Sequence, residues 1–534
     1  VILVPKIMPP PPPPPPPELP GFYYDPEKNR YFPIKGPIPG SSRSSFSSSS
    51  KHATHKAPHT SSTQEKSRSC CRKLRSRTSK LIQGREIDGH RVIASHNFKS
   101  SFTEEFRNIQ ASQPSVWRYK GTHKIGISDL KQVHVRVQTL EGECDSDIIL
   151  TGSTNGSFSL CEVGRDGGYF DGEVEWSPDF VKNYVKGKSD EYNVMPGTVS
   201  RPTGGSVVMS SGISCIRLGP ECSSHVANGG PIVGHALFTT LGSETSGGSI
   251  YTLGLVESLD LGPGILNTWS RLDEVASFKC TIWTAEYDYN RHRAIIGTNM
   301  GAALVDLATG RRSWFLRCKS DIFAQQIVNS RNLVLCGLRN GAIVSVDFRE
   351  KGDRVSRTLI EHRIPYASSN KKVRNSSKEW FKVSGDIDPS LTIRMPSSIS
   401  SLVSLQYDDQ YFLASSMDGT MRLYDLRQLQ RGSVQSYEGH VNSHSRIQLG
   451  VDPAERFVMS GGEDHKLRSW SIKSGKLLFE EKFCDSVLSS VCYQSCKGFK
   501  AEDEMNNQYK HECCMGAWLG SHDEGLFYMR WLYV

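Results

Sequence analysis

The stretch FLASSMDGTMRLYDLR, residues 412–427, predicts a strand, a tight turn and a returning strand. Its first five residues are apolar or small, and Asp418-Gly419 is a dipeptide that commonly joins two antiparallel strands. Met421, Leu423 and Tyr424 supply the apolar side chains of the second strand. We therefore expect a β-hairpin at this point of the chain.

The same pattern returns at four other places in weaker form. Each copy has an apolar run, then Asn or Asp with Gly usually next to it, then a second strand that ends in an aromatic or aliphatic residue. The copies begin at Ile148, Arg293, Asn332 and Arg456 and read IILTGSTNGSFSLCEV, RAIIGTNMGAALVDLA, NLVLCGLRNGAIVSVDFR and RFVMSGGEDHKLRSWSI. Repeats of about forty residues built from short antiparallel strands are typical of a β-propeller. We predict an all-β fold, a propeller with seven blades.

Composition divides the 534-residue chain into segments of different character. An unbroken proline run at 9–17 and a later stretch rich in Ser, Arg, Lys and His cannot build a core, so we expect both to be disordered. Between them, ELPGFYYDPEKNRYFPI gathers five aromatic residues that either dock on the propeller or form a linear motif for a partner. The predicted segments are a Pro-rich tail at 1–17, the aromatic motif at 18–34, a Ser-rich basic linker at 35–97, and the propeller at 115–534 with insertions near 164–205 and 350–396. FTEEFRNIQASQ, just before the propeller, favours a short helix.

Charge and cysteine usage limit the compartment and the partners. The chain has a formal net charge of +8, and no apolar run approaches the roughly 20 residues that span a bilayer, so we expect no membrane contact. Fourteen cysteines without a disulfide-scaffold spacing fit a reducing compartment, nucleus or cytoplasm. Residues 64–85 carry eight basic side chains against one acid, Glu65, and such a run is either a nuclear import signal, a nucleic-acid contact or a solvated linker.

Catalytic signatures are missing from the sequence. It contains no GxSxG, no HExxH and no phosphate-binding GxxxxGK[ST]. Cys70-Cys71 and Cys513-Cys514 are adjacent pairs without a second CxxC, a weak pattern for zinc. We therefore expect no enzymatic activity, no cofactor and no metal site.

One copy of the repeat carries four polar residues at a distinctive spacing. His440, Ser460, Asp464 and Trp470 resemble the structural tetrad of a WD40 repeat, in which these residue types connect the outer loop to the inner hairpin of a blade. A buried imidazole, hydroxyl, carboxylate and indole N–H must satisfy one another, so we expect a hydrogen-bonded chain. The other copies keep only the turn residue, at Asn155, Asn299, Asn340 and Asp418.

Two of the predicted hairpins end in an acid and an arginine two residues apart. These are Asp347 with Arg349, and Asp425 with Arg427. On an extended strand end both side chains project to the same side, so they can pair, and the guanidinium can then offer donors to a partner. Alternatively, each is an ordinary strand end followed by a chance basic residue.

These two ends resemble the WDxR box of WD40 substrate receptors that dock on the damaged-DNA-binding-protein adaptor of cullin-4 RING ubiquitin ligases. Residues 412–427 match the whole box, with Tyr424 in the place of Trp, and the box ending at Arg349 has Val346 there. The segment PELPGFYYDPEKNRYF at 17–32 is similar to the N-terminal signature of one member, in its plant-like form. The resemblance implies that Asp347, Arg349, Tyr424, Asp425 and Arg427 contact the adaptor.

The function that this resemblance implies is substrate recognition within a cullin-4 ligase, with an unknown protein as substrate and the ubiquitin chemistry done by other subunits. An alternative from another class is a nuclear scaffold that binds nucleic acid or chromatin through its basic segments. Salt separates the two, because nucleic-acid binding falls steeply as salt rises.

Overall fold

The computed structural model describes part of the chain. The described residues are 22–25, 30–33, 91–94 and 98–531, the last range with gaps at 124, 140–141, 165–173, 185–194, 203, 220, 223–231, 244, 257, 261–268, 289–291, 329–331, 349–358, 366–379 and 495–514. Residues 1–64 and 65–534 form two separate units. In the first unit, β1 (Phe22–Asp25) and β2 (Arg30–Pro33) form an antiparallel hairpin within the predicted aromatic motif.

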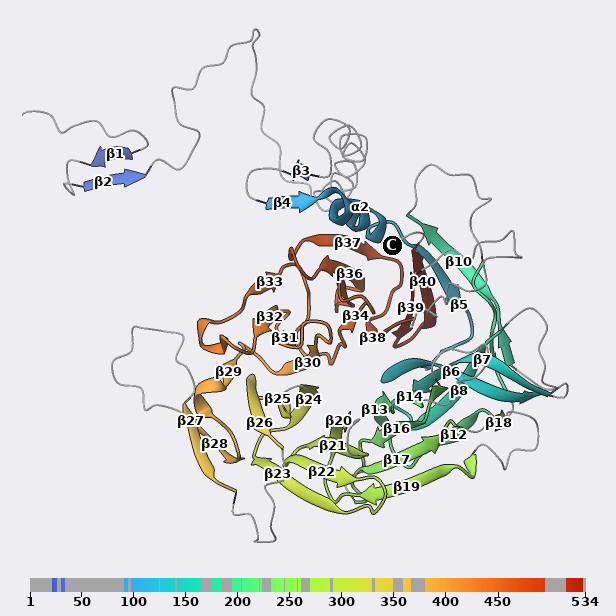
Figure 1. Ribbon diagram of the computed structural model, residues 1–534. Coiled ribbons are helices and arrows are strands. Elements are labelled where there is room, and N and C mark those ends of the chain that lie inside the picture. The colour runs from blue at the N-terminus through green and yellow to red at the C-terminus, as the bar shows by residue number, and fades with distance from the viewer. Residues whose placement is uncertain are drawn as a thin grey trace, which may run out of the picture. The chain divides into compact units, whose positions relative to one another are not determined.

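The second unit is a ring of seven blades, as the sequence predicted (Figure 1). In blades 2, 4, 5 and 6 the strands run from the centre of the ring outward in chain order, and most neighbouring blades touch through their innermost strands. Blades 2, 4, 5 and 6 are four-stranded antiparallel sheets. Blade 2 contains β13 (Ile213–Leu218), β16 (His235–Thr240), β17 (Ser249–Gly254) and β19 (Leu272–Ser277). Blade 4 contains β24 (Ile322–Val328), β25 (Leu333–Leu338), β26 (Ala342–Asp347) and β29 (Ile393–Arg394). Blade 5 contains β30 (Ile399–Ser404), β31 (Tyr411–Ser416), β32 (Met421–Asp425) and β33 (Gln435–Tyr437), and blade 6 contains β34 (Gly450–Val451), β35 (Phe457–Ser460), β36 (Lys466–Ser471) and β37 (Leu477–Lys482).

The other three blades carry additional strands at their edges. Blade 1 contains β6 (Asp129–Thr139), β7 (Gly142–Gly152), β8 (Ser157–Val163), β9 (Val174–Trp176), β11 (Val199–Arg201), β12 (Ser206–Val208) and the parallel β18 (Leu259–Asp260). Blade 3 contains β20 (Ile282–Asp288), β21 (Arg293–Thr298), β22 (Gly301–Asp306), β23 (Arg312–Cys318), β28 (Trp380–Gly385) and β27 (Glu361–Pro365). Blade 7 contains β38 (Leu488–Tyr493), β39 (Met515–Ser521), β40 (Gly525–Trp531), β5 (Ser115–Tyr119) and β10 (Pro178–Asn183).

Several short elements lie outside the blades. They are β3 (Arg91–Ala94) with β4 (Phe98–Ser101), β14 (Glu221–Cys222) with β15 (Ile232–Val233), the helix α2 (Phe102–Ala111), and the 3-10 turns η3 (Pro389–Leu391) and η4 (Leu429–Arg431). The helix is where the sequence predicted one. The predicted disordered linker at 35–97 includes a strand at its end. Residues 91–94 pair with 98–101, and this strand contains the β-favouring residues Val92 and Ile93. The rest of that linker and the tail at 1–17 lie outside the described residues.

The predicted insertions are not only loops. The described part of 164–205 contributes β9, β10 and β11, and that of 350–396 contributes β27, β28 and β29. β10 pairs with β5 on the edge of blade 7, and β28 pairs with β23 on the edge of blade 3. An outer strand of a blade exposes unpaired backbone groups, so these added strands cover two edges that would otherwise be open.

The ring is closed by two distant parts of the chain. β5, at the start of the propeller, is the fourth strand of blade 7 and pairs with β40 near the C-terminus. The described apolar core residues form seven clusters, one at each junction between neighbouring blades. Each blade is therefore stabilised by its two neighbours, and burial of the clusters supplies the main favourable term.

Candidate partner-binding site

The two predicted Asp-x-Arg ends occupy equivalent positions in neighbouring blades. β26 and β32 are the third strands of blades 4 and 5, and they end at Asp347 and Asp425. Each aspartate pairs in register with the first residue of the second strand, Leu333 or Tyr411. Because all blades share one strand order, both ends lie on the same face of the ring. We call this face the Asp-x-Arg face.

Arg427 is held in one orientation by Asp425. The guanidinium donates from Nε to Oδ1 at 3.0 Å and from Nη2 to Oδ2 at 2.8 Å, a two-point contact. The backbone N–H of Arg427 also donates to Oδ1, at 2.8 Å. The Asp425 side chain is 7% exposed and that of Arg427 is 49% exposed. Hydrogen bonding to Asp425 raises the pKa of Arg427, so the side chain is a fixed cation with free solvent-facing donors.

A neighbouring tyrosine, which the sequence did not single out, extends this contact. Nη2 of Arg427 lies 3.4 Å from the hydroxyl of Tyr411, and the guanidinium lies 5.9 Å from the centre of the Tyr411 ring. On the same face, the loop between β30 and β31 presents Tyr407, which is 79% exposed. Glu455 from blade 6 accepts from the backbone N–H groups of Gln406 and Tyr407, and so fixes that loop. The face therefore combines an oriented arginine, the tyrosine that it contacts and a second, exposed tyrosine, and Arg and Tyr are residue types common at interface centres.

Tyr424 is not part of this surface, which corrects the prediction that it contacts a partner. Its side chain is 1% exposed and stacks on Phe412 with the ring centres 5.4 Å apart. It belongs to the cluster between blades 4 and 5. The alternation of a strand explains this, because Tyr424 points to the opposite side from Asp425. Its role in the box is to anchor the strand that carries the pair.

The second predicted pair is described only in part. Asp347 is half-buried, and its backbone N–H donates to the carbonyl of Asp386 at 3.3 Å. Arg349 lies outside the described residues, so its pairing stays a prediction. In blade 3 the equivalent strand end has Asp306 followed by Leu307 and Ala308, without the arginine.

Asp306 shows what an acid at this position does on its own. Its carboxylate accepts from the backbone N–H groups of Ala308 at 3.1 Å and Thr309 at 2.9 Å, and from the Thr309 hydroxyl at 2.9 Å. These bonds lower the pKa of Asp306. The aspartate alone therefore stabilises the following turn, whereas Asp425 also orients an arginine.

The helix α2 lies at the corresponding strand end of blade 6. There Ser471 and Lys473 stand where blade 5 has Asp425 and Arg427. The Lys473 ammonium contacts Glu104 of α2 at 3.2 Å, and that of Lys476 contacts Glu105 at 3.4 Å. The cation of blade 6 is thus already paired within the chain, whereas Arg427 keeps donors facing solvent.

The predicted tetrad does not form as one hydrogen-bonded chain. His440 Nε2 lies 3.2 Å from the Ser460 hydroxyl and donates to the Gly461 carbonyl at 3.0 Å, so these two predicted members do meet. Trp470 Nε1 donates instead to the Glu438 carbonyl, at 2.9 Å. Within the described residues His440 Nδ1 has no partner, and burial lowers the pKa of its imidazole.

Arg468 is the reason that Asp464 does not reach His440. The Arg468 side chain is 3% exposed and donates to both oxygens of Asp464, at 2.9 and 2.5 Å. A carboxylate binds a guanidinium more strongly than a neutral imidazole N–H. Both oxygens of Asp464 therefore accept from Arg468 and not from His440.

The turn residues of the other blades have a local role. Asn155, Asn340 and Asp418 each accept from the backbone N–H two residues further on, at 3.0, 3.1 and 3.1 Å. Such a contact stabilises a turn by itself. Gly419 follows Asp418 with φ +81°, and a Cβ there would lie 2.6 Å from the His440 carbonyl, so glycine is required.

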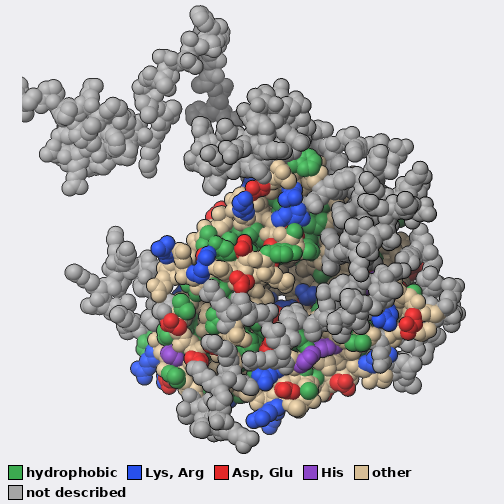
Figure 2. Space-filling view, viewed as in Figure 1, with side chains coloured by type: hydrophobic (Ala, Val, Ile, Leu, Met, Phe, Trp, Pro, Cys, Tyr) green, Lys and Arg blue, Asp and Glu red, His purple; other side chains and the backbone are tan. Residues whose placement is uncertain are grey.

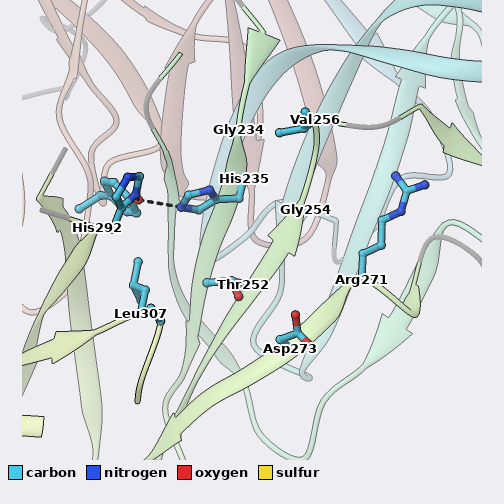
Figure 3. Close-up of a pocket in the computed structure, with 11 residues that line it drawn as sticks. Gly234, His235, Thr252, Gly254, Val256, Arg271, Asp273, His292 and Leu307 are labelled. Atoms are coloured by element: carbon cyan, nitrogen blue, oxygen red, sulfur yellow. Dashed lines mark hydrogen bonds between the residues drawn. The ribbon is translucent and has the colours of Figure 1, made fainter. Parts of the chain in front are cut away.

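A separate pocket lies between blades 2 and 3, as Figure 3 shows. It has a volume of about 540 Å³, and His235 Nε2 lies 2.8 Å from the Tyr287 hydroxyl, which lies 3.2 Å from His292 Nδ1. Burial and the neighbouring His292 lower the pKa of His235, so this imidazole is neutral at pH 7. This arrangement was not predictable from the sequence, because its three residues come from two strands of different blades and a turn.

Among the described residues there is neither a candidate membrane span nor a candidate metal site. No helix among them has the length and apolarity to cross a membrane. No group of three His, Cys, Asp or Glu side chains in the described ranges is placed to hold a metal ion. The cysteine pairs at 70–71 and 513–514 lie outside those ranges.

Comparisons with known proteins agree with the propeller. The family model "WD domain, G-beta repeat" matches residues 389–425 and 431–471. The human protein "DDB1- and CUL4-associated factor 4" is 24% identical over 468 residues, covering 86% of this chain and 78% of the relative. The bovine protein of the same name is 28% identical over 182 residues, covering 34% of this chain and 30% of the relative.

Among solved structures, the WD40 β-propeller domain of Doa1 is similar, with 13% identity, a TM-score of 0.41, and coverage of 78% of this chain and 96% of that one. The matched repeats comprise the strands of blade 5 and most of blade 6. The chain is therefore a propeller that contains matches to the WD40 repeat at 389–425 and 431–471, and it is similar over most of its length to human DDB1- and CUL4-associated factor 4.

Proposed function

We propose that this chain is a non-catalytic substrate-recognition subunit of a cullin-4 RING ubiquitin ligase. In this role it binds the damaged-DNA-binding-protein adaptor through the Asp-x-Arg face and holds a substrate protein elsewhere. The similarity to DDB1- and CUL4-associated factor 4 supports membership of a cullin-4 ligase complex. The geometry of Asp425 and Arg427 supports the choice of the Asp-x-Arg face as the adaptor-binding surface. Tethering raises the local concentration of substrate at the ligase, and no chemistry is required of the propeller itself.

The observation that carries the proposal is that Arg427 is oriented before any partner arrives. Its two-point contact with a nearly buried carboxylate removes most of the side-chain freedom that binding would otherwise have to remove. About half of the side chain still faces solvent, with hydrogen-bond donors available. Arg349 would add a second such contact one blade away.

Co-purification from cells tests the proposal. The tagged chain should recover the adaptor and the cullin, the Arg427→Ala variant should recover much less, and the Arg349→Ala, Arg427→Ala double variant should recover none. Arg431→Ala is the matched control, since Arg431 is exposed four residues away and contacts only the Gln428 side chain among the described residues. Recovery of adaptor at the wild-type level by the folded double variant would contradict the proposal.

We also propose that the protein works in the nucleus, the cytoplasm or both. The basic run at 64–85 supports nuclear import but does not require it. A fluorescent fusion of the full chain should enter the nucleus, and replacing the eight basic residues of that run by Gln should reduce its nuclear fraction. An unchanged distribution would assign the run to a linker.

A further inference from the structure

The axis of the ring contains a cavity with a volume of about 460 Å³. Residues from the innermost segments of all seven blades line it, and Figure 2 shows the hollow at the centre of the ring with Lys or Arg side chains inside. Its wall is mostly polar. Examples of polar lining residues are Gln132, Thr284, Gln325, Ser400 and Gln448.

Most charges in this cavity are already paired. Asp129 is fully buried and accepts from the backbone N–H groups of Ile216 and Leu130, at 2.7 and 2.8 Å. Arg217 contacts Asp129 at 3.4 Å and Glu286 at 3.1 Å, and Lys131 contacts Asp129 at 3.8 Å. Asp129 and Glu286 are therefore used by Arg217 and Lys131. The other two carboxylates of the lining also have partners, since Asp452 contacts Arg456 at 3.3 Å and Glu455 accepts from backbone N–H groups of the blade 5 loop.

Arg446 is the third cation that lines the cavity, after Lys131 and Arg217. It precedes the first strand of blade 6, and its Nη1 donates to the Ser214 carbonyl of blade 2, at 3.3 Å. No carboxylate of the described residues lies within ion-pair distance of it, and its buried Nε has no hydrogen-bond partner. Burial lowers the pKa of Arg446 and so does Arg217 nearby, while Cys215 and Asp129 offset part of this effect without forming an ion pair with it. An unpaired guanidinium in such a place is costly unless something compensates its charge.

A second unsatisfied group lines the same cavity. Gln325, on the first strand of blade 4, is 1% exposed. Its Nε2 donates to the Cys336 sulfur at 3.6 Å, but its Oε1 has no partner among the described residues. This acceptor is buried behind the wall, so the group that a ligand in the cavity can reach is the guanidinium of Arg446.

We propose that this cavity binds an Asp or Glu side chain of a partner protein, with the carboxylate on Arg446. A carboxylate supplies the missing charge and accepts from a guanidinium at two points. The volume is ample for one such side chain but not for a folded domain, so the ligand is an extended acidic segment that inserts a single side chain.

The position of Arg446 in the ring leaves the Asp-x-Arg face free. Arg446 and Ser214 lie at the starts of first strands. In blade 5 the first strand begins at Ile399, which pairs with Ser416 at the end of β31. Asp425 pairs with Tyr411, at the beginning of β31 and so at the other face of the ring. Arg446 therefore lies toward the face opposite Arg427. The inference rests on the proposed function only in identifying the acidic partner as a substrate.

Binding of defined peptide pools to the full chain, without adaptor, tests the inference. Each pool is a fluorescein-labelled octapeptide with a fixed central residue and randomised neighbours, the central residue being Glu, Gln or phosphoserine. Fluorescence anisotropy should show the Glu pool binding at least about tenfold more tightly than the Gln pool. Equal binding of these two pools would overturn the proposal. Binding of the phosphoserine pool about tenfold more tightly than the Glu pool would assign the site to phosphate instead.

The Arg446→Met variant should lose the preference for Glu, whereas the matched control Arg311→Met should keep it, because Arg311 is exposed. Retention by Arg446→Met, or equal loss in both variants, would contradict the assignment. Adaptor binding on the opposite face and thermal unfolding report whether the variant is folded. If Arg446→Met does not fold, Arg446→Lys decides, since it should prefer Glu but bind it more weakly. Wild-type affinity or no preference in that variant would overturn the proposal.

Discussion

Asp425 and Arg427 show how a strand end can hold an exposed cation in one orientation. The carboxylate is nearly buried, while the guanidinium that it orients is about half exposed. The sequence predicted this pair because side chains two apart on a strand project to one side. It could not show that Tyr411 would join the pair, because Tyr411 comes from the neighbouring strand and becomes a neighbour only through the register.

Substitutions of Tyr424 test whether this residue is a buried anchor of the strand and not a contact with the adaptor. Since its ring is buried against Phe412, Tyr424→Phe should keep adaptor affinity within about twofold. Tyr424→Ala should instead lower the free energy of unfolding by about 3–5 kcal/mol, the usual cost of deleting a buried aromatic side chain. Chemical denaturation and adaptor binding measure the two effects. If a folded Tyr424→Phe variant bound the adaptor much more weakly, the hydroxyl would have to contact the adaptor, and the burial argument would be wrong.

At the scale of single blades, the hairpins were predictable and their side-chain partners were not. Turn dipeptides such as Asp418-Gly419 determine local geometry, so the sequence is sufficient to place them. The spacing of His440, Ser460, Asp464 and Trp470 predicted residue types but not the competition from Arg468. Strands of two or three residues, such as β9 and β29, are too short to show a period, so the sequence predicted the insertions but not the strands within them.

Double-mutant cycles in blade 6 separate the two possible partners of Asp464. Cycles of free energies of unfolding with Asp464→Ala and Arg468→Ala should give a coupling of about 1–3 kcal/mol, because the carboxylate and guanidinium touch. The same cycle between Asp464 and His440 should give a coupling near zero. A large coupling to His440 would mean that the predicted tetrad forms after all.

His440 should make blade 6 sensitive to acid. Its pKa in the folded protein is below the usual value of about 6.5, so below that pH the unfolded chain binds more protons than the folded one. Stability should therefore fall as the pH is lowered from about 6.5 toward the folded pKa. Thermal unfolding of wild type and His440→Gln across pH 5–8 measures this. The variant should show a shallower loss in this range, and identical slopes would exclude His440 as the cause.

At the scale of the whole ring, the decisive contact joins the two ends of the propeller. The sequence predicted seven blades and a start at 115, but not that β5 would complete blade 7, because that pairing spans about four hundred residues. A closed ring has no open edge between its first and last blades. β5 therefore contributes to the stability of every blade through its neighbours.

Truncation tests this closure. A chain that begins at residue 98 keeps α2 and β5 and should unfold with a midpoint close to that of the full chain. A chain that begins at residue 122 lacks β5, exposes the edge of β40, and should unfold at a clearly lower temperature or aggregate. Calorimetry of both chains provides the comparison. Equal midpoints would show that blade 7 does not need its N-terminal strand.

The affinity of the purified chain for the purified damaged-DNA-binding-protein adaptor is the most direct test of the central claim. Arg427→Ala should raise the Kd at least about tenfold, because the oriented guanidinium is lost from the centre of the contact. Arg431→Ala, the same change four residues away, should leave the Kd within about twofold, and circular dichroism should show both variants folded. A Kd for folded Arg427→Ala equal to that of the wild type, or no adaptor binding by the wild type itself, would contradict the account.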